Sequence, residues 1–568
     1  MNTIFRFLSI PKSALSGRFC RDLPRLTNFV VESDDSSYNQ GMCADASKPL
    51  HSRDIYGVRL MVFLGGLASI GTEISATNLI APYFGESTFI WATVIGLTLA
   101  FLAIGYHFGG RVADKHPHLW LFYLVIAIAG VAAGFLPFVA RPILSSSVSA
   151  FRDYDVGAFY GALIGVLVLL AVPITLLGFV SPFAVRLSID TLSHAGGTSG
   201  SIYALGTIGS IAGSFLPVLL LVPWIGTTRT FLTLSLMLVI PATIGLLFYR
   251  AWRPAMVATG LSVMMMVSNA WVSAQTIREP QRGELVYETE SSNNYIQVTQ
   301  DGSATLLWLN DGHAIHSIYD PEDLLTGGPW DYFMIGPLFT DQQAPAMIDN
   351  ALIIGLGAGT SSKQITVGYG DVPIDGVEID PEIVRVGREY FDMNEPNLNV
   401  IVQDGRYVLR TTTTQYDLIA VDAYEQPYIP FQLTSQEFFT EVDDALTPEG
   451  VAVMNVGRTS TDYRLVEVMA STMKSVFDFV YVIDTDRYAN SMIIGTNAPS
   501  SIETFEQNVA NQPDGPVRTV GETSLRTGNI RAITEVDVVF TDDHAPVERV
   551  VDMIIIDEAL PTNRDEDD

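Results

Sequence analysis

Acidic residues close three short apolar runs in the second half of the chain: Glu378, Asp404 and Asp422. A short continuous apolar run is typical of a buried parallel strand. The carboxyl ends of parallel strands meet at one edge of a doubly wound sheet, and such folds bind their ligands at that edge. A carboxylate there can hold an ammonium group, accept from hydroxyls or act as a general base. Each acid alone could be a helix cap or a solvated loop residue, but three in this arrangement predict a ligand site.

Three alternate glycines, Gly355, Gly357 and Gly359, follow the apolar run that starts at Ala351. Glycine allows a tight turn and a close approach of backbone to a ligand. The spacing G-x-G-x-G differs from the dinucleotide fingerprint, so taken alone it also fits an ordinary strand-to-helix turn. Glu378 follows at about 20 residues, the separation at which nucleotide folds place a carboxylate on the ribose hydroxyls. Glycines and acid together predict a nucleoside site.

The order of these motifs resembles spermidine synthase, a polyamine aminopropyltransferase with a methyltransferase-like fold. That family carries G-G-G-D-G, then E-I-D, then G-D-G, then D-S-[ST]-D-P. The matching stretches here are 355–359, Glu378-Ile-Asp380, Asp404-Gly405 and Asp422-Ala-Tyr-Glu425, and the likeness covers about residues 284–460.

The resemblance implies transfer of an aminopropyl group from decarboxylated S-adenosylmethionine to an amine, without a metal. Asp422 is the implied proton acceptor and Glu425 the anchor of the amine, while Glu378 takes the ribose hydroxyls and Asp404 the adenine amino group. The other implied residues are Gly355, Gly357, Gly359, Asp380 and Gly405 for the donor, and Asn294, Tyr332 and Tyr424 for the amine.

Ala358 departs from the family, which has an acid here that contacts the amino group of the aminopropyl chain. Loss of such a charge-assisted hydrogen bond costs roughly 1.5–3 kcal/mol. Two alternatives therefore stay open. The domain could use S-adenosylmethionine as a methyltransferase, or it could bind a polyamine or nucleoside without turnover, as part of a transporter or sensor.

The first half of the chain is predicted to cross a membrane. Its apolar segments reach about 20 residues, the length that spans a bilayer. It resembles the membrane part of fused transporter/spermidine synthase proteins at 79–85, 109–114 and 181–186. The seven predicted segments lie near 60–81, 89–109, 119–140, 157–185, 201–224, 229–249 and 255–275.

Glu73 is the one acid well inside a predicted span. A carboxylate in hydrocarbon normally faces a cavity or a partner. It could bind a cation or an amine, or it could pair with His107 or Arg111. The Lys/Arg bias favours a cytoplasmic N-terminus, which after seven spans puts the soluble domain outside, whereas a donor made from S-adenosylmethionine is expected inside.

The predicted fold is a multi-pass α-helical membrane domain, then a small β domain, then a Rossmann-like doubly wound α/β sheet with strands at 351–355, 375–379, 399–403 and 417–421. The net charge of −30 lies mostly in the second half and argues against nucleic acid as a partner. Expected partners are an amine or polyamine and the lipid bilayer, with a homodimer as an option. The predicted parts are a disordered tail at 1–56, a membrane domain at 57–277, the β domain at 278–340, the Rossmann-like domain at 341–560 and an acidic tail at 561–568.

Overall fold

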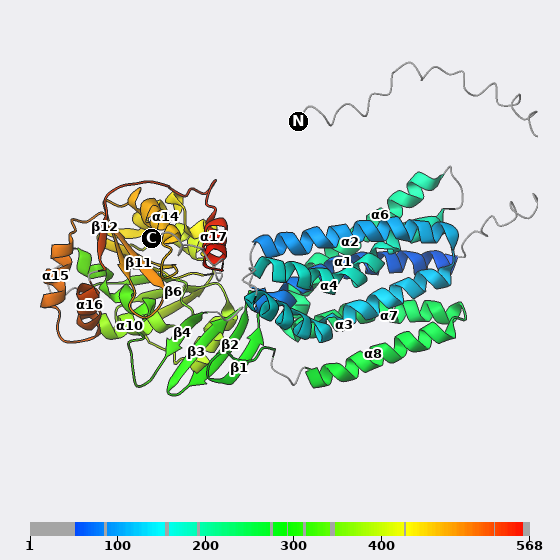
Figure 1. Ribbon diagram of the computed structural model, residues 1–568, viewed down its shortest axis with the longest axis horizontal. Coiled ribbons are helices and arrows are strands. Elements are labelled where there is room, and N and C mark those ends of the chain that lie inside the picture. The colour runs from blue at the N-terminus through cyan, green and yellow to red at the C-terminus, as the bar shows by residue number, and fades with distance from the viewer. Residues whose placement is uncertain are drawn as a thin grey trace, which may run out of the picture. The chain divides into compact units, whose positions relative to one another are not determined.

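A computed structural model describes the chain between Ser52 and Ala559 (Figure 1). The described ranges are 52–84, 88–153, 158–189, 194–272, 277–291, 293–310, 314–340, 347–424, 428–527 and 529–559. The predicted disordered tail, except for its last residues, and the acidic tail lie outside them, as does Glu425.

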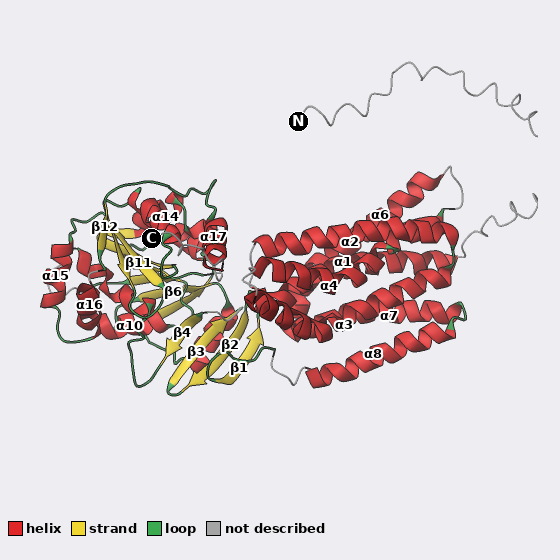
Figure 2. Cartoon of the chain, viewed as in Figure 1, coloured by secondary structure: helices red, strands yellow, loops and turns green. Residues whose placement is uncertain are grey.

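The first described part is entirely helical, as Figure 2 shows. Five stretches of it are long and apolar enough to cross a membrane, and the fifth runs from Ala195 to Phe248 without a break in helix assignment. That stretch contains two of the predicted segments, divided where Gly226 adopts a φ of 77°. The segment predicted at 255–275 falls on a helix that is not among the five. The helices are α1 (Ser52–Phe84), α2 (Thr88–Lys115), α3 (Leu119–Asp153), α4 (Ala158–Gly178), α5 (Val180–Ser188), α6 (Ala195–Leu216), the π-helix η3 (Pro217–Leu221), α7 (Val222–Phe248) and α8 (Trp252–Val272).

Small residues bring α1 and α6 into close contact. A Cβ atom added at Gly209 would lie 2.0 Å from the carbonyl oxygen of Phe63, and one added at Gly213 would lie 2.2 Å from that of Leu67. Such backbone approach is the usual way in which membrane helices associate, because only glycine leaves room for it.

Glu73 is buried in α1 and is only 9% exposed. The predicted alternative of a pair with His107 or Arg111 is not formed: within the described residues Glu73 has no ion-pair partner, and both of those side chains are exposed. The binding of a cation or an amine stays a prediction for this position.

A four-stranded antiparallel sheet follows, in the order β1-β2-β3-β4. One face of it packs Ile296, Leu307 and Leu309 against Ile383 and Phe391 of the neighbouring α/β domain. The small sheet is thereby held beside the first residues of α11 (Pro381–Tyr390). Its strands are β1 (Glu284–Glu290), β2 (Tyr295–Asp301), β3 (Ala304–Leu309) and β4 (Ile315–Tyr319).

An eight-stranded sheet forms the centre of the α/β domain, in the order β12-β10-β11-β9-β8-β5-β6-β7. Five neighbouring strands are parallel, and β11 is antiparallel to both β9 and β10. The predicted doubly wound fold and its four strands are confirmed, with bounds that differ by one residue or so. The strands are β5 (Ala351–Ile354), β6 (Ile374–Glu378), β7 (Leu398–Val402), β8 (Tyr416–Val421), β9 (Leu446–Gly457), β10 (Phe479–Asp484), β11 (Asn490–Thr496) and β12 (Arg531–Ile533).

Apolar layers cover both faces of this sheet. Leu352 and Ile354 of β5 belong to one layer, and the alternate residues Ala351 and Ile353 belong to the other, as the two-residue period of a strand requires. The covering elements are α9 (Pro329–Tyr332), the 3₁₀ helices η4 (Phe333–Phe339) and η5 (Phe431–Leu433), α10 (Thr360–Tyr369), α11, α12 (Gly405–Thr411), α13 (Gln436–Ala445), α14 (Arg464–Lys474), α15 (Ile502–Asn511), α16 (Pro516–Thr527) and α17 (Val547–Ala559).

The strand order reverses at β5. Its two neighbours are β6 on one side and β8 on the other. The chain therefore continues from β5 toward β6 and from β8 toward β9, in opposite directions along the sheet. Open α/β sheets bind ligands at such a switch point, outside the carboxyl ends of the strands. Gly355 and Asp422 are the first residues beyond the ends of β5 and β8.

Candidate active site

A cavity of about 830 Å³ lies at the carboxyl ends of the parallel strands. Eight predicted site residues line it, from β5 to β8 and from the small sheet. They are Asn294, Gly355, Gly357, Glu378, Asp404, Gly405, Asp422 and Tyr424.

Glycine is required at the turn after β5. Gly355 has a φ of +89°, and an added Cβ would lie 2.4 Å from the carbonyl oxygen of Asp422. The backbone N–H of Gly357 donates a 2.9 Å hydrogen bond to Oε2 of Glu378. The turn thus brings its backbone against a carboxylate at the cavity wall.

Glu378 ends β6, and its side chain is 7% exposed. Its second oxygen, Oε1, accepts a 3.0 Å hydrogen bond from the backbone N–H of Asp380. Burial raises the pKa of this carboxyl to about 7 even though backbone donors favour the ionised form. Each carboxylate oxygen can accept more than one hydrogen bond, so Glu378 can still receive a ligand hydroxyl.

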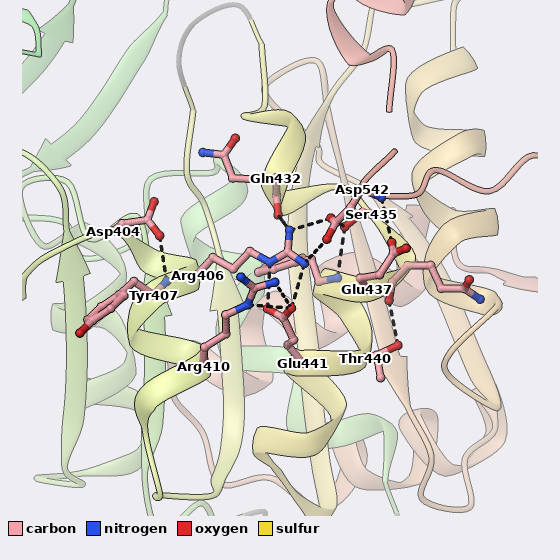
Figure 3. Close-up of polar contacts among 12 residues, drawn as sticks. Asp404, Arg406, Tyr407, Arg410, Gln432, Ser435, Glu437, Thr440, Glu441 and Asp542 are labelled. Atoms are coloured by element: carbon pink, nitrogen blue, oxygen red, sulfur yellow. Dashed lines mark hydrogen bonds and ion pairs between the residues drawn. The ribbon is translucent and has the colours of Figure 1, made fainter. Parts of the chain in front are cut away.

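Asp404 stands at the start of α12, where its Oδ1 accepts a 2.8 Å hydrogen bond from the backbone N–H of Tyr407 (Figure 3). This N-cap fixes the side chain beside the cavity. The next residue, Gly405, has no room for a side chain, because an added Cβ would lie 2.4 Å from the side chain of Ile354.

Asp422 lies just after β8, on the opposite side of the Gly355 turn from Glu378. Nδ2 of Asn455 donates a 2.8 Å hydrogen bond to its Oδ1, and the indole of Trp330 is a second donor. Burial outweighs both and raises the pKa of the Asp422 carboxyl to about 7. A carboxylate with that pKa is suited to general base catalysis near neutral pH.

Asn455 and Trp330 also line the cavity and are absent from the sequence-based site. Asn455 carries a sequence signal, because it is the single polar side chain within the run Val451–Val456 of β9. Trp330 lies two residues before the predicted Tyr332. The hydroxyl of Tyr332 instead accepts from the backbone N–H of Asp486 at 3.2 Å, and Tyr332 is not among the lining residues.

Asp380 does not reach the cavity wall. It is fully buried and caps α11 by accepting from the backbone N–H of Glu382 at 2.9 Å. Its other oxygen accepts from Ser291 and from Nδ2 of Asn294, at 2.5 and 2.9 Å. Asp380 therefore joins the small sheet to α11 and positions Asn294 at the cavity.

Tyr424 and Gly359 have structural partners as well. The Tyr424 hydroxyl donates to the carbonyl of Asn455 at 3.0 Å and accepts from the N–H of Gly457 at 2.8 Å, and Tyr424 also lines the cavity. Gly359 begins α10 with a φ of +92° and packs against Met393.

Ala358 is 2% exposed and belongs to the apolar cluster of Ile296, Ile383 and Phe391 rather than to the cavity lining. Its backbone N–H donates a 2.9 Å hydrogen bond to Ser317. The side chain at position 358 therefore belongs to the apolar cluster and not to the wall of this cavity.

The site combines two chemical environments. At one end, the carboxylates of Glu378 and Asp404 supply hydrogen-bond acceptors beside the Gly355 turn. Asp422 with its two donors lies toward β8 and β9. Within the described residues, no cluster of three potential metal ligands occurs.

Residues 337–504 match the Spermine/spermidine synthase domain family. A probable polyamine aminopropyl transferase of Bifidobacterium longum is 33% identical over 343 residues, which cover 56% of this chain and 74% of the relative. A polyamine aminopropyltransferase of Oceanobacillus iheyensis is 25% identical over 382 residues, covering 63% and 70%. Among solved structures, a probable spermidine synthase from Corynebacterium glutamicum is 22% identical, with a TM-score of 0.35 and coverage of 43% and 95%.

Proposed function

Because the chain belongs to the polyamine aminopropyltransferase family of transferases, we propose that it moves an aminopropyl group from decarboxylated S-adenosylmethionine to an amine. The observation that carries this proposal is the position of Asp422. Its carboxyl, with a pKa of about 7, lies in the same cavity as the nucleoside-type acceptors Glu378 and Asp404. A base and a nucleoside end in one cavity are what the reaction needs.

The reaction is a displacement at the carbon next to the donor's sulfonium. The acceptor nitrogen forms a bond to that carbon, the carbon–sulfur bond breaks, and its electron pair returns to sulfur to give methylthioadenosine. The acceptor arrives largely as an ammonium ion and must lose one proton before it attacks. Asp422 takes that proton, and its charge also draws the ammonium into place.

The nucleoside end would position the donor. Glu378 would accept hydrogen bonds from the two ribose hydroxyls, and Asp404, with Gly405 beside it, would accept one from the adenine amino group. The hydrogen bond from Gly357 to Glu378 supports this arrangement, since it orients the carboxylate before the ligand arrives.

We also propose that α1 to α7 hold the enzyme in a membrane as a multi-pass protein. The five apolar stretches support this. The cytoplasmic side suits the site domain, because the donor derives from S-adenosylmethionine made in the cell.

The purified full-length chain should convert decarboxylated S-adenosylmethionine and a diamine to methylthioadenosine and an aminopropylated amine, measured by liquid chromatography and mass spectrometry. A parallel assay uses S-adenosylmethionine in place of the decarboxylated donor, as a control. Formation of S-adenosylhomocysteine and a methylated product from it would replace the proposal with methyl transfer. Binding of methylthioadenosine without any turnover would instead support a sensor.

A further inference from the structure

The last helix, α17, lies beyond the matched family domain, which ends at residue 504. It nevertheless contributes Val551 and Ile554 to the lining of the cavity. Both side chains are buried, at 7% and 6% exposure. A segment outside the matched domain thus supplies part of the cavity wall.

The wall that α17 helps to form is apolar. Val551 and Ile554 share one hydrophobic cluster with Leu433 and Leu465, and all four line the cavity. Leu465 belongs to α14, which follows β9, and α17 packs on that helix. In the strand order β9-β8-β5-β6-β7, β9 is next to β8, and Asp422 is the first residue after β8. The apolar wall therefore borders the part of the cavity left for the acceptor.

Polar contacts hold α17 and the segment before it, among them contacts of Asp542, Asp552 and Asp557. Arg406 of α12 forms an ion pair with Asp542 at 2.7 Å, and the same guanidinium binds Glu441 of α13 and the carbonyl of Gln432 (Figure 3). The side chain of Arg406 is only 8% exposed and that of Asp542 is 40% exposed, so the pair lies partly out of solvent.

The other two contacts lie on the helix itself. The hydroxyl of Tyr428 donates to Asp552 at 2.7 Å, and Arg464 pairs with Asp557 at 2.7 Å. Tyr428 lies a few residues after Asp422, in the stretch that leads to Leu433. The helix is therefore fastened both to α14 and to the segment that follows the proposed base.

We propose that α17 is the specificity wall of the acceptor site, with Val551 and Ile554 in contact with the hydrocarbon chain of the amine and limiting its length. This inference rests on the proposed function. Apolar side chains cannot bind an ammonium group, but they favour the methylene groups between two amines. A fixed wall at a set distance from Asp422 excludes chains that are too long.

The test measures kcat and KM for unbranched α,ω-diamines of increasing length, with the full-length chain and three variants. Ile554→Val removes one methylene and keeps the fold. The double variant Val551→Ala/Ile554→Ala widens the cavity, and Met553→Ala is the control, since Met553 is 37% exposed on the same helix. Calorimetric titration of the same diamines in the presence of methylthioadenosine gives a second readout that needs no turnover.

We expect the double variant to prefer a longer diamine than the parent does. For the parent's best diamine, KM should rise about fourfold for each methylene group removed from the wall, in Ile554→Val as in the double variant, while KM for the donor stays constant. Met553→Ala should match the parent. If the parent binds and uses diamines and the variants keep its length profile, α17 does not select the length of the amine. The proposed function would then still stand. If the parent neither uses nor binds any diamine, both fall.

Discussion

Nδ2 of Asn490 donates a 2.9 Å hydrogen bond to the side-chain oxygen of Asn455, and this fixes which end of the Asn455 amide faces Asp422. With its oxygen occupied, Asn455 presents its NH₂ group to the carboxylate at 2.8 Å. Two neighbouring strands, β9 and β11, thus orient the group that stabilises the ionised form of Asp422.

Asn455→Asp should move the activity profile to higher pH. The substitution removes a donor and places a second carboxylate beside Asp422, so the pKa of Asp422 should rise further, by roughly one unit. The pH dependence of kcat/KM gives the midpoint. Asn399→Asp, at the far end of β7, is the control and should leave it unchanged. An unmoved midpoint in Asn455→Asp would show that this amide does not act on the base.

Asp422→Asn should lower turnover by roughly 10²–10⁴ and preserve binding of methylthioadenosine, because it removes the base and keeps the shape. Single-turnover rates and calorimetric titration separate the two effects. Turnover equal to the parent's would exclude Asp422 from the mechanism.

The stability of the α/β domain should fall as the pH rises from about 4 to about 7. Asp422 and Glu378 both have pKa values raised to about 7 by burial, so the folded chain binds more protons than the unfolded chain between about pH 4 and pH 7. Their contribution to stability is fully present below the unfolded pKa and is lost as the pH passes the folded value. Thermal unfolding at about pH 5 and about pH 8.5 measures this slope.

Asp422→Asn should flatten that slope and stabilise the folded state at high pH, by an amount on the order of a few kcal/mol. Activity and stability would then change in opposite directions in one variant. Asp371→Asn, at an exposed position, should keep the parent's slope. The interpretation fails if both variants retain it.

Glu378→Gln and Asp404→Asn should each weaken binding of methylthioadenosine by about tenfold, because each removes a charged acceptor of one or two hydrogen bonds. Asp380→Asn serves as a comparison: Asp380 caps α11 outside the cavity, so this change should lower the melting temperature more than the affinity. Isothermal titration and thermal unfolding distinguish the three. Undiminished affinity in both Glu378→Gln and Asp404→Asn would remove them from the nucleoside site.

Ala358→Asp should destabilise the chain without improving aminopropyl transfer. The new carboxylate would enter the apolar cluster around Phe391, where a charge is costly. Ala358→Ser is the milder control. A gain in transfer from decarboxylated S-adenosylmethionine would mean that the acid reaches the donor after all.

Local patterns in the sequence were sufficient to predict the parallel strands of the sheet and the edge at which their carboxyl ends meet. Short apolar runs ending in Glu378, Asp404 and Asp422 predicted the strands and the residues just beyond them, because side-chain period and strand-end position are local properties. The tight turn at Gly355 and Gly357 could be predicted for the same reason. A positive φ and a close approach of the backbone to its neighbours disfavour other residues there.

Tertiary packing alone decided which polar groups reach the cavity. Asp380 sits two residues from Glu378, yet it turns to cap α11, and Trp330 rather than Tyr332 approaches Asp422. Asn455, Asn490, Val551 and Ile554 enter the site from elements distant in sequence, through β9, β11 and α17. Periodicity predicts where each strand or helix forms, but a contact between distant segments depends on how their apolar faces pack together, and no local pattern encodes that.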